Sequence, residues 1–463
     1  MPMNPLSSAS TPPRMVVVGA GPAGVRAAQT LLHHGVRPVI IDEAPLPGGQ
    51  IYRQNLVPRG SARQRYGFEH KRAAAIHAAG AQLRGQADYR ARTAVWNATP
   101  GHLDLVRDGE LDGLRYSHLL IATGATDRVL PFPGWTLPGV FSLGGAQIAL
   151  KGQHCLLGPR IVFAGTGPLL YLVAYQYARA GGQVRAVLDS APLAAQASAL
   201  PALLNQPGTL AKGLYYLGWL RAHGVPVHHS ASLLAAQGMT RVEGVRARIG
   251  GAERDFACDA LAVGHGLRPE TQLADLLDCA FDFDAAQRVW LPRRDADGRS
   301  TVSGVYLAGD GASIGGAMLA ELSGERGALA MLADSGMRVD AARLRWLARK
   351  QAALARFRQG LNRAFPLSGT GAGCDDSVIV CRCEEVRAGE LRAAARQYAV
   401  DDLNRLKALT RIGMGLCQGR MCQGGAAELL AECRRIPLSA VGRMRGQAPV
   451  KPLPFAVLGK DPS

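Results

Sequence analysis

The stretch that most constrains this chain is Met15–Gly24, which reads MVVVGAGPAG. Three consecutive valines predict a buried strand that runs directly into a glycine-rich turn. In such a strand–turn–helix unit, the first glycine permits the tight turn and the second lets backbone N–H groups approach a pyrophosphate. The third lets the helix pack on the strand, with its positive N-terminal end facing the phosphates. The motif predicts a dinucleotide site formed by Gly19, Gly21, Pro22, Ala23 and Gly24.

A carboxylate follows at the position expected for ribose binding. Residues 39–41 predict a second strand, which ends on Asp42, eighteen residues past Gly24. In dinucleotide-binding units a carboxylate near this spacing hydrogen-bonds the ribose. Glu43 adjoins it, and a glycine turn follows. We therefore expect the cofactor to contact Asp42, Glu43, Gly49 and Gln50.

Two later strand ends complete the pattern. Residues 118–121 predict a buried strand that breaks at Ala-Thr-Gly, and residues 304–308 predict a strand that ends in Gly-Asp, ahead of a helix. This order and spacing resembles the glutathione-reductase type of two-domain flavoprotein, in which such an aspartate hydrogen-bonds the ribityl chain of FAD. We therefore predict FAD, with further contacts from Ala122, Thr123, Gly124, Gly309, Asp310 and Ala317.

The opening motif occurs a second time, 146 residues later (Gly19 to Gly165). Residues 160–170 again read as strand, glycine loop and helix, and a further strand ends on an aspartate. Leu170 stands where the third glycine belongs, and a leucine there should hold the helix away from the strand. Two interpretations stay open, a working NAD or ATP site and a structural relic. The candidate residues are Gly165, Gly167 and Asp189.

Four of the nine cysteines form two close pairs near the C-terminus. Cys381 and Cys383 form a C-x-C pair, Cys417 and Cys422 form a C-x4-C pair, and 33 residues lie between the pairs. Four thiolates from two turns bind a [2Fe–2S] cluster or a tetrahedral zinc ion. The other cysteines stand alone and are interpreted as buried or incidental: Cys155, Cys258, Cys279, Cys374 and Cys433.

Charge and hydropathy exclude other classes of function. The formal net charge is +17, but aromatic residues are few and do not alternate with the basic ones, so we expect no nucleic-acid binding. We interpret the charge mainly as a matter of composition, with attraction to anionic cofactors or an acidic partner in addition. No apolar run reaches the roughly 18 residues of a membrane span, and the first residues lack the apolar core of a signal peptide. We expect a cytoplasmic protein, not integral to the membrane, that is either free or peripheral to its inner face.

The combination of motifs resembles a known family. GAGPAG, DEAPLPGGQIYR, IATGA, PFPGWTLPGV, GTGPLL, GDGASIGGA and the C-terminal CRCEE and GMGLCQGRMCQGG cover nearly the whole chain. They are similar to the α (A or B) subunits of opine oxidases, D-hydroxyproline dehydrogenase, hydrogen cyanide synthase and dye-linked L-proline dehydrogenases, and to the central part of the sarcosine oxidase α chain. The last module resembles the bacterioferritin-associated ferredoxin type, which implies a [2Fe–2S] cluster on Cys381, Cys383, Cys417 and Cys422.

The resemblance implies a division of labour. In that family a separate β subunit, similar to D-amino-acid oxidase, oxidises the amine through its own flavin, and the α chain moves electrons onward; some members add a small ferredoxin-like γ subunit. It implies an electron-transfer subunit of a dehydrogenase for a secondary amine or amino acid, with D-hydroxyproline or an opine favoured. A second nucleotide and an FMN at a subunit interface stay open. We assign no catalytic residue to this chain.

Two other functions stay open. One is a stand-alone NAD(P)H-dependent flavoprotein reductase that feeds a ferredoxin-like partner, which needs a working second nucleotide site. The other is a scaffold with a structural FAD and a redox-sensing cluster. No redox-active cysteine pair follows the Gly48-Gly49 turn, which argues against a disulfide reductase.

The predicted fold class is α/β: two Rossmann-like dinucleotide-binding domains of the glutathione-reductase type and a small, mainly α, C-terminal iron–sulfur domain. The expected division is a disordered leader (1–13), an FAD domain (14–130 and 295–336), a second nucleotide domain (131–294), a helix and linker (337–373), a [2Fe–2S] domain (374–440) and a tail (441–463).

Overall fold

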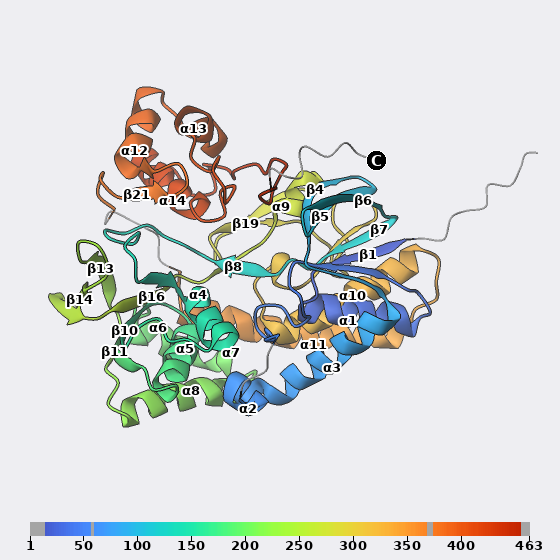
Figure 1. Cartoon of the computed structure of the whole chain (residues 1–463), viewed down its shortest axis with the longest axis horizontal. Helices are drawn as coiled ribbons and strands as arrows, with labels where there is room; N and C mark the ends of the chain where they lie inside the picture. Colours follow the sequence, from blue (N-terminus) through green and yellow to red (C-terminus); the bar gives the residue numbers. More distant parts are fainter. Residues whose placement is uncertain (1–13, 57–59, 368–373, 455–463) are drawn as a thin grey trace, which may run out of the picture.

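The computed structural model describes residues 14–56, 60–367 and 374–454. The expected leader, the glycine-rich part of the expected linker and the last nine residues of the expected tail lie outside the described residues. Figure 1 shows two α/β units side by side, with the C-terminal module, coloured orange to red, against both of them.

The first unit is built on a five-stranded sheet in the order β20-β7-β1-β2-β3, and every neighbouring pair is parallel. A parallel sheet is covered on both faces, which explains why these strands are almost continuously apolar. Helices α1, α3 and α10 pack on one face, and an antiparallel sheet of β4, β5 and β6 covers the other. The bounds are β1 (Met15–Val18), α1 (Pro22–His33), β2 (Val39–Asp42), α2 (Ala62–Tyr66), η1 (Gly67–Glu69), α3 (His70–Gln86), β3 (Asp88–Ala91), β4 (Thr93–Thr99), β5 (His102–Arg107), β6 (Glu110–Arg115), β7 (His118–Ile121), β20 (Val305–Leu307), η3 (Gly309–Gly311) and α10 (Ala317–Asp334).

The second unit repeats this arrangement. Its parallel sheet has the order β9-β16-β10-β11-β12, and the antiparallel sheet β13-β14-β15 takes the place of β4-β5-β6. The bounds are β9 (Val140–Ser142), α4 (Leu143–Ile148), η2 (Ala149–Gln153), β10 (Arg160–Gly165), α5 (Pro168–Arg179), β11 (Gln183–Asp189), α6 (Leu193–Ser198), α7 (Leu200–Leu203), α8 (Pro207–Ala222), β12 (Val227–His228), β13 (Ser232–Gln237), β14 (Gly244–Ile249), β15 (Ala252–Ala257) and β16 (Ala260–Gly264). The two-unit α/β fold predicted from the repeated motif is confirmed.

A two-stranded ribbon joins the units. β8 (Ala125–Asp127) follows the end of β7, and β17 (Leu267–Pro269) follows the end of β16, so the two strands occupy equivalent places in the repeats. They pair antiparallel, with Leu267 opposite Asp127 and Pro269 opposite Ala125. The chain therefore leaves each sheet through one strand of the ribbon, and the pairing of these two strands connects the units.

The C-terminal module has its own core. Its elements are β21 (Ile379–Cys381), β22 (Val386–Arg387), α12 (Ala388–Gln397), α13 (Leu403–Thr410) and α14 (Gln423–Arg434). Leu391, Leu403, Leu406 and Leu429 are buried together in it, and Trp135 joins them from outside the module. Trp135 also donates an indole hydrogen bond to the Ile379 carbonyl at 2.6 Å. The module is thus anchored on the segment that connects the two α/β units.

Some chain segments pack in a different unit from the one to which the expected domain division assigned them. Leu273 and Leu277, beside α9 (Gln272–Leu276), pack into the core of the first unit, so the chain re-enters that unit before residue 295. The hairpin β18 (Phe281–Asp284) and β19 (Val289–Pro292) follows. Val450 of the expected tail is buried in the same core. No helix in the described ranges is long and apolar enough to cross a membrane.

Candidate cofactor sites

The first glycine loop has no room for a side chain at two of its positions, Gly19 and Gly24. A Cβ atom on Gly19 would lie 2.3 Å from the carbonyl oxygen of Ala122, and one on Gly24 would lie 1.7 Å from the carbonyl oxygen of Gly19. Helix α1 begins at Pro22, and its N-cap Gly21 provides no side-chain cap. Its first N–H groups are therefore directed at the space where a pyrophosphate would bind. The loop fits the phosphates of a dinucleotide.

The carboxylates after β2 brace this loop. Asp42 accepts hydrogen bonds from the backbone N–H groups of Ala20 and Ala44, the latter at 2.6 Å. Burial raises the pKa of Asp42, and the two backbone donors oppose that effect. Glu43 is exposed and pairs with Lys451 at 2.7 Å, so the end of the described chain reaches this edge of the sheet.

The turn after Glu43 closes over the glycine loop. Gly49 has φ of +62°, and a Cβ atom on it would lie 2.9 Å from the Cα atom of Gly21. The exposed Gln50 accepts hydrogen bonds from Arg53 through its side-chain oxygen. The predicted residues of this turn therefore lie against the predicted pyrophosphate loop.

The flavin end of the site is formed at the carboxyl ends of β7 and β20. Asp310 Oδ1 accepts hydrogen bonds from the N–H groups of Gly315 and Gly316 at 2.8 and 2.9 Å. A Cβ atom on Gly311 would lie 2.8 Å from Thr123 Oγ1, so the two strand ends are in contact. Helix α10 begins at Ala317 without a side-chain cap. The structure thus brings all four predicted FAD motifs to one sheet edge, and this edge fits FAD.

The second glycine loop has a different shape. Gly167 has φ of +102° and Gly21, its counterpart, has φ of −74°. The N–H of Leu170 bonds the Gly167 carbonyl three residues back at 3.1 Å, whereas the N–H of Val25 bonds Gly21 four residues back at 2.9 Å. Leu170 itself is fully buried in the core of the second unit. The first turn of α5 is therefore wound more tightly than that of α1.

The aspartate of the second site is already occupied by the protein. Asp189 is fully buried and accepts hydrogen bonds from the Tyr171 hydroxyl, from Ala191 N–H at 2.9 Å and from Gln196 at 3.1 Å. Burial raises the pKa of Asp189. Its counterpart in the first unit, Asp42, is partly exposed, whereas Asp189 has no exposed surface to offer a ribose.

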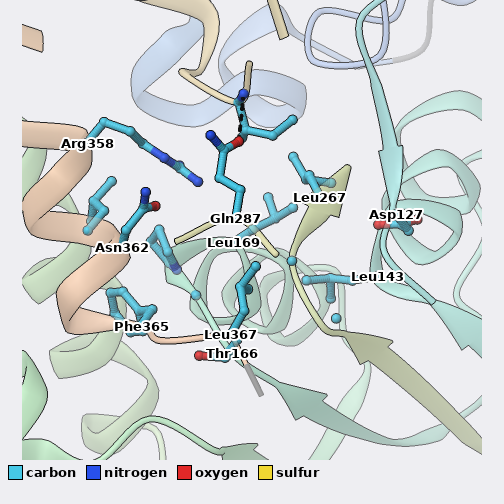
Figure 2. Close-up of a pocket in the computed structure, with 16 residues that line it drawn as sticks. Asp127, Leu143, Thr166, Leu169, Leu267, Gln287, Arg358, Asn362, Phe365 and Leu367 are labelled. Atoms are coloured by element: carbon cyan, nitrogen blue, oxygen red, sulfur yellow. Dashed lines mark hydrogen bonds between the residues drawn. The ribbon is translucent and has the colours of Figure 1, made fainter. Parts of the chain in front are cut away.

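The end of α11 (Ala341–Ala364) lies in front of the second loop. A cavity of about 110 Å³ lies between this helix and the segment from Thr166 to Leu169. Figure 2 shows the side chains that line it. Arg358 and Asn362 enter it from α11, and Phe365 and Leu367 line it beside Thr166. The helix thus fills part of the space that a second nucleotide would need.

The four paired cysteines come together at one place. Cys381 is the last residue of β21, and Cys383 lies in the turn between β21 and β22. Cys417 and Cys422 lie in the loop before α14. The Cys422 thiol donates to Cys381 and Cys417, which lowers the pKa of Cys381 to about 6 and that of Cys417 to about 5. The same contacts raise the pKa of Cys422, and burial raises that of Cys383.

The loops around these sulfurs are tightly packed. A Cβ atom on Gly415 would lie 2.3 Å from the Cβ atom of Cys383. Backbone groups of Gly413 and Glu384 hydrogen-bond the Cys381 sulfur, and those of Met421 and Gly419 hydrogen-bond the Cys417 sulfur. Hydrogen bonds to ligand sulfurs are typical of iron–sulfur sites. The described chain contains no group of three or more His, Cys, Asp or Glu side chains around a single metal ion. Four thiols from two turns, with backbone hydrogen bonds to two of their sulfurs, fit the ligand set of a [2Fe–2S] cluster.

The two sites are linked by a contact that no motif in the sequence predicted. Thr123 Oγ1 donates to the Glu270 carbonyl at 2.7 Å, and Glu270 N–H donates to the Gly124 carbonyl at 3.0 Å. The Glu270 carboxylate accepts from Arg420 Nε of the cluster loop at 2.7 Å. Because β7 and β16 hold equivalent places in the two repeats, the segments that follow them could have been predicted to pair as the ribbon. No local sequence pattern marks Glu270.

Comparisons with protein families support both modules. Residues 13–327 match the family described as pyridine nucleotide-disulphide oxidoreductase, and residues 379–432 match the BFD-like [2Fe-2S] binding domain.

Curated relatives match over nearly the full length. The A subunit of opine oxidase from Rhizobium meliloti (strain 1021) is 37% identical over 95% of this chain and 96% of its own. The HcnB subunit of hydrogen cyanide synthase from Pseudomonas aeruginosa is 36% identical over 96% of this chain and 97% of its own.

Solved structures share the fold at lower identity. L-proline dehydrogenase from P. horikoshii has a TM-score of 0.69 and 19% identity, and it covers 97% of this chain and 79% of its own. Thioredoxin reductase from T. acidophilum has a TM-score of 0.51 and 22% identity over 69% of this chain and 98% of its own. The second structure matches only about the length of the two α/β units.

Proposed function

Because the chain belongs to the pyridine nucleotide-disulphide oxidoreductase family, together with HcnB and the opine oxidase relative, we propose that it is the electron-transfer subunit of a heteromeric dehydrogenase. The complex would oxidise a secondary amine or amino acid, with D-hydroxyproline or an opine favoured. FAD would be held by the first glycine loop, Asp42 and the ends of β7 and β20, and a [2Fe–2S] cluster by the four paired cysteines.

The observation that carries this proposal is the contact between the two sites. Glu270 hydrogen-bonds Thr123 and Gly124 at the flavin end and Arg420 in the cluster loop. When bound, the two cofactors supply the redox chemistry, because flavin and iron–sulfur centres accept and release electrons. The protein's part is to hold them side by side and to adjust their potentials.

The substrate would be oxidised elsewhere in the complex. The relatives are named as subunits, which supports a partner subunit. We propose, from the family resemblance, that this partner is of the amino-acid-oxidase type. We keep an interface FMN and a small, ferredoxin-like third subunit as further expectations. The predicted FAD-binding residues of the first unit, and the domain division with Leu273, Leu277 and Val450 assigned to that unit, are part of the same proposal. We also propose a cytoplasmic location, which is in keeping with the nine cysteines, none of which forms a disulfide.

The proposal is tested on the complex purified from its host through a tag on this chain. Under anaerobic conditions, D-hydroxyproline or an opine should generate the electron paramagnetic resonance (EPR) signal of a reduced cluster. The chain alone, loaded with both cofactors, should give no signal with the same amines. Amine oxidation at full rate by the chain alone, or a cluster that stays oxidised while the complex turns over, would contradict the proposal.

A second candidate function is an NAD(P)H-dependent reductase, which the repeated glycine loop favours. The buried Asp189 and the end of α11 in front of the loop count against it. NADH should therefore leave the flavin of the isolated chain oxidised. Rapid bleaching of that flavin by NADH would favour the reductase over the electron-transfer role.

A further inference from the structure

We propose that Arg268, Glu270 and Arg420, which we call the ribbon triad, set the reduction potential of the cluster bound by the four paired cysteines. The two guanidinium groups would favour the reduced cluster and the carboxylate would oppose it. This inference rests on the proposed function, because that function supplies the cluster. It concerns how residues of the α/β units act on the potential of the cluster.

Arg268 reaches from β17 into the cluster loop. Its Nη1 donates to the carbonyl oxygens of Arg420 at 2.8 Å and Gly419 at 3.5 Å, and its Nη2 lies 3.5 Å from the side-chain oxygen of Gln423. Gln272 donates to the Gln418 carbonyl at 2.9 Å. These acceptors belong to the segment between Cys417 and Cys422 and to the residue after it, so a residue of the ribbon holds the loop that carries two ligands.

Arg420 holds the other side of the same loop. Its Nε donates to Glu270 Oε2 at 2.7 Å, and its Nη1 donates to the carbonyl oxygens of Cys417 at 3.4 Å and Val450 at 2.7 Å. The Arg420 side chain is 14% exposed and that of Glu270 is 11% exposed. The pair is therefore screened from water, and its charges act over a longer range than surface charges do.

The sign of each contribution follows from the charge of the cluster. Reduction of a [2Fe–2S] cluster adds one electron, so a nearby cation stabilises the product and a nearby anion destabilises it. Desolvation lowers the pKa of Arg268, and the carboxylate of Glu270 opposes that effect. The guanidinium group of Arg268 also hydrogen-bonds the backbone of the cluster loop, which places its positive charge beside the cluster ligands.

Glu270 also ties the triad to the flavin end. Its backbone bonds Thr123 and Gly124, so its carboxylate is held at a fixed place relative to both cofactor sites. In the described part of the chain, this is where the ribbon, the predicted flavin residues and the cluster loop meet. The triad is thus placed to adjust the difference in potential between the two cofactors.

The test is an EPR-monitored redox titration of the chain loaded with both cofactors, with chemical mediators and no amine or partner. Arg268→Gln should lower the midpoint potential of the cluster, and Glu270→Gln should raise it. Each change should amount to at least about a tenfold change in the one-electron equilibrium constant, which is about 59 mV. Arg268→Lys keeps the charge and should shift the potential less than Arg268→Gln.

The opposite signs separate an electrostatic role from a structural one. Arg160→Gln removes a charge that pairs with Asp259 at the start of β10 and should leave the potential unchanged. Shifts of the same sign in Arg268→Gln and Glu270→Gln, or no shift at full iron content, would overturn the proposal. If Arg268→Gln loses iron, Glu270→Gln decides: a raised potential at full iron content supports the proposal, and a lowered or unchanged potential overturns it. Since reduction here is chemical, failure of the amine assay on the complex would leave this result intact.

Discussion

At the scale of single residues, the two glycine loops differ because one position differs. Gly24 has the Gly19 carbonyl in the space of its missing side chain, so only glycine fits there. Leu170, at the equivalent position, is buried in the core and the turn before it is rewound. We expected a leucine here to hold the helix away from the strand, and the tighter first turn of α5 is in keeping with that expectation.

The cluster ligands can be tested one residue at a time. Cys417→Ser should abolish the iron content and the EPR signal, because serine is a poor replacement for a thiolate ligand in a soft sulfur site. FAD content should stay full, since the glycine loop lies in a different unit. Cys155→Ser, which changes an exposed cysteine, should keep both cofactors. Wild-type iron content in Cys417→Ser, or zinc in place of iron in the wild-type chain, would contradict the assignment.

The stability of the chain should fall in acid partly because of His265. Burial and the neighbouring Arg128 lower the pKa of His265 to about 3, whereas an unfolded histidine titrates near 6.5. Below about pH 6.5 the unfolded chain therefore binds a proton that the folded chain does not, and the free energy of unfolding decreases as the pH falls, by up to about 1.4 kcal/mol per pH unit.

Urea unfolding at pH 7 and pH 5 measures this effect. His265→Leu should lose less stability between the two pH values than the wild-type chain does. His34→Gln, at an exposed histidine, should keep the wild-type loss. An equal loss in His265→Leu and the wild-type chain would show that His265 is not the group responsible.

At the scale of elements, α14 docks the cluster module on the connecting segment. A Cβ atom on Gly425 would lie 2.5 Å from Pro131 Cδ, whereas one on the adjacent Gly424 would have its nearest neighbour, the Val129 carbonyl oxygen, at 3.9 Å. Gly425→Ala should therefore loosen this contact, and Gly424→Ala should be tolerated.

Limited proteolysis and thermal unfolding would compare the two glycine variants. We expect Gly425→Ala to lose about 1–3 kcal/mol, as overpacked sites do, and to release the C-terminal module as a faster-cleaved fragment. Gly424→Ala should match or slightly exceed the wild-type stability, because alanine is the better helix former. Equal behaviour of the two variants would contradict the docking role of this face of α14.

At the scale of the whole molecule, buried charges connect units that are distant in sequence. Glu428 of α14 accepts from Arg128 at 2.8 Å and from Arg288 Nε at 2.9 Å, and the Arg128 and Glu428 side chains are only 6% and 8% exposed. Burial lowers the pKa of Arg128 to about 10. The network lies between the ribbon, the β18–β19 hairpin and the cluster module.

Glu428→Gln should destabilise the docked arrangement by about 3–5 kcal/mol, since it leaves the buried charge of Arg128 without its carboxylate. The double variant Arg128→Met with Glu428→Leu should cost less than Glu428→Gln alone, because it removes both charges of one pair. Differential scanning calorimetry measures both. A double variant that is less stable than Glu428→Gln would contradict a role dominated by charge burial.

Short spacings along the chain were enough to predict much of this protein. The glycine loop, the strand ends at Ala122 and Asp310 and the two cysteine pairs were all visible as local patterns. The fold class and the family that they predicted are confirmed. Such patterns can be recognised in the sequence because a turn, a strand end or a pair of ligands is formed by residues a few positions apart.

How these parts meet depends instead on the packing of the folded chain. The hydrogen bond from Tyr171 to Asp189, the end of α11 in front of the second loop and the contact of Glu270 with Arg420 join segments whose individual patterns are unremarkable. Each contact depends on how whole helices and strands pack, and packing is set by shape and burial over the entire core. Residues 150 positions apart therefore become neighbours without any local sign in the sequence.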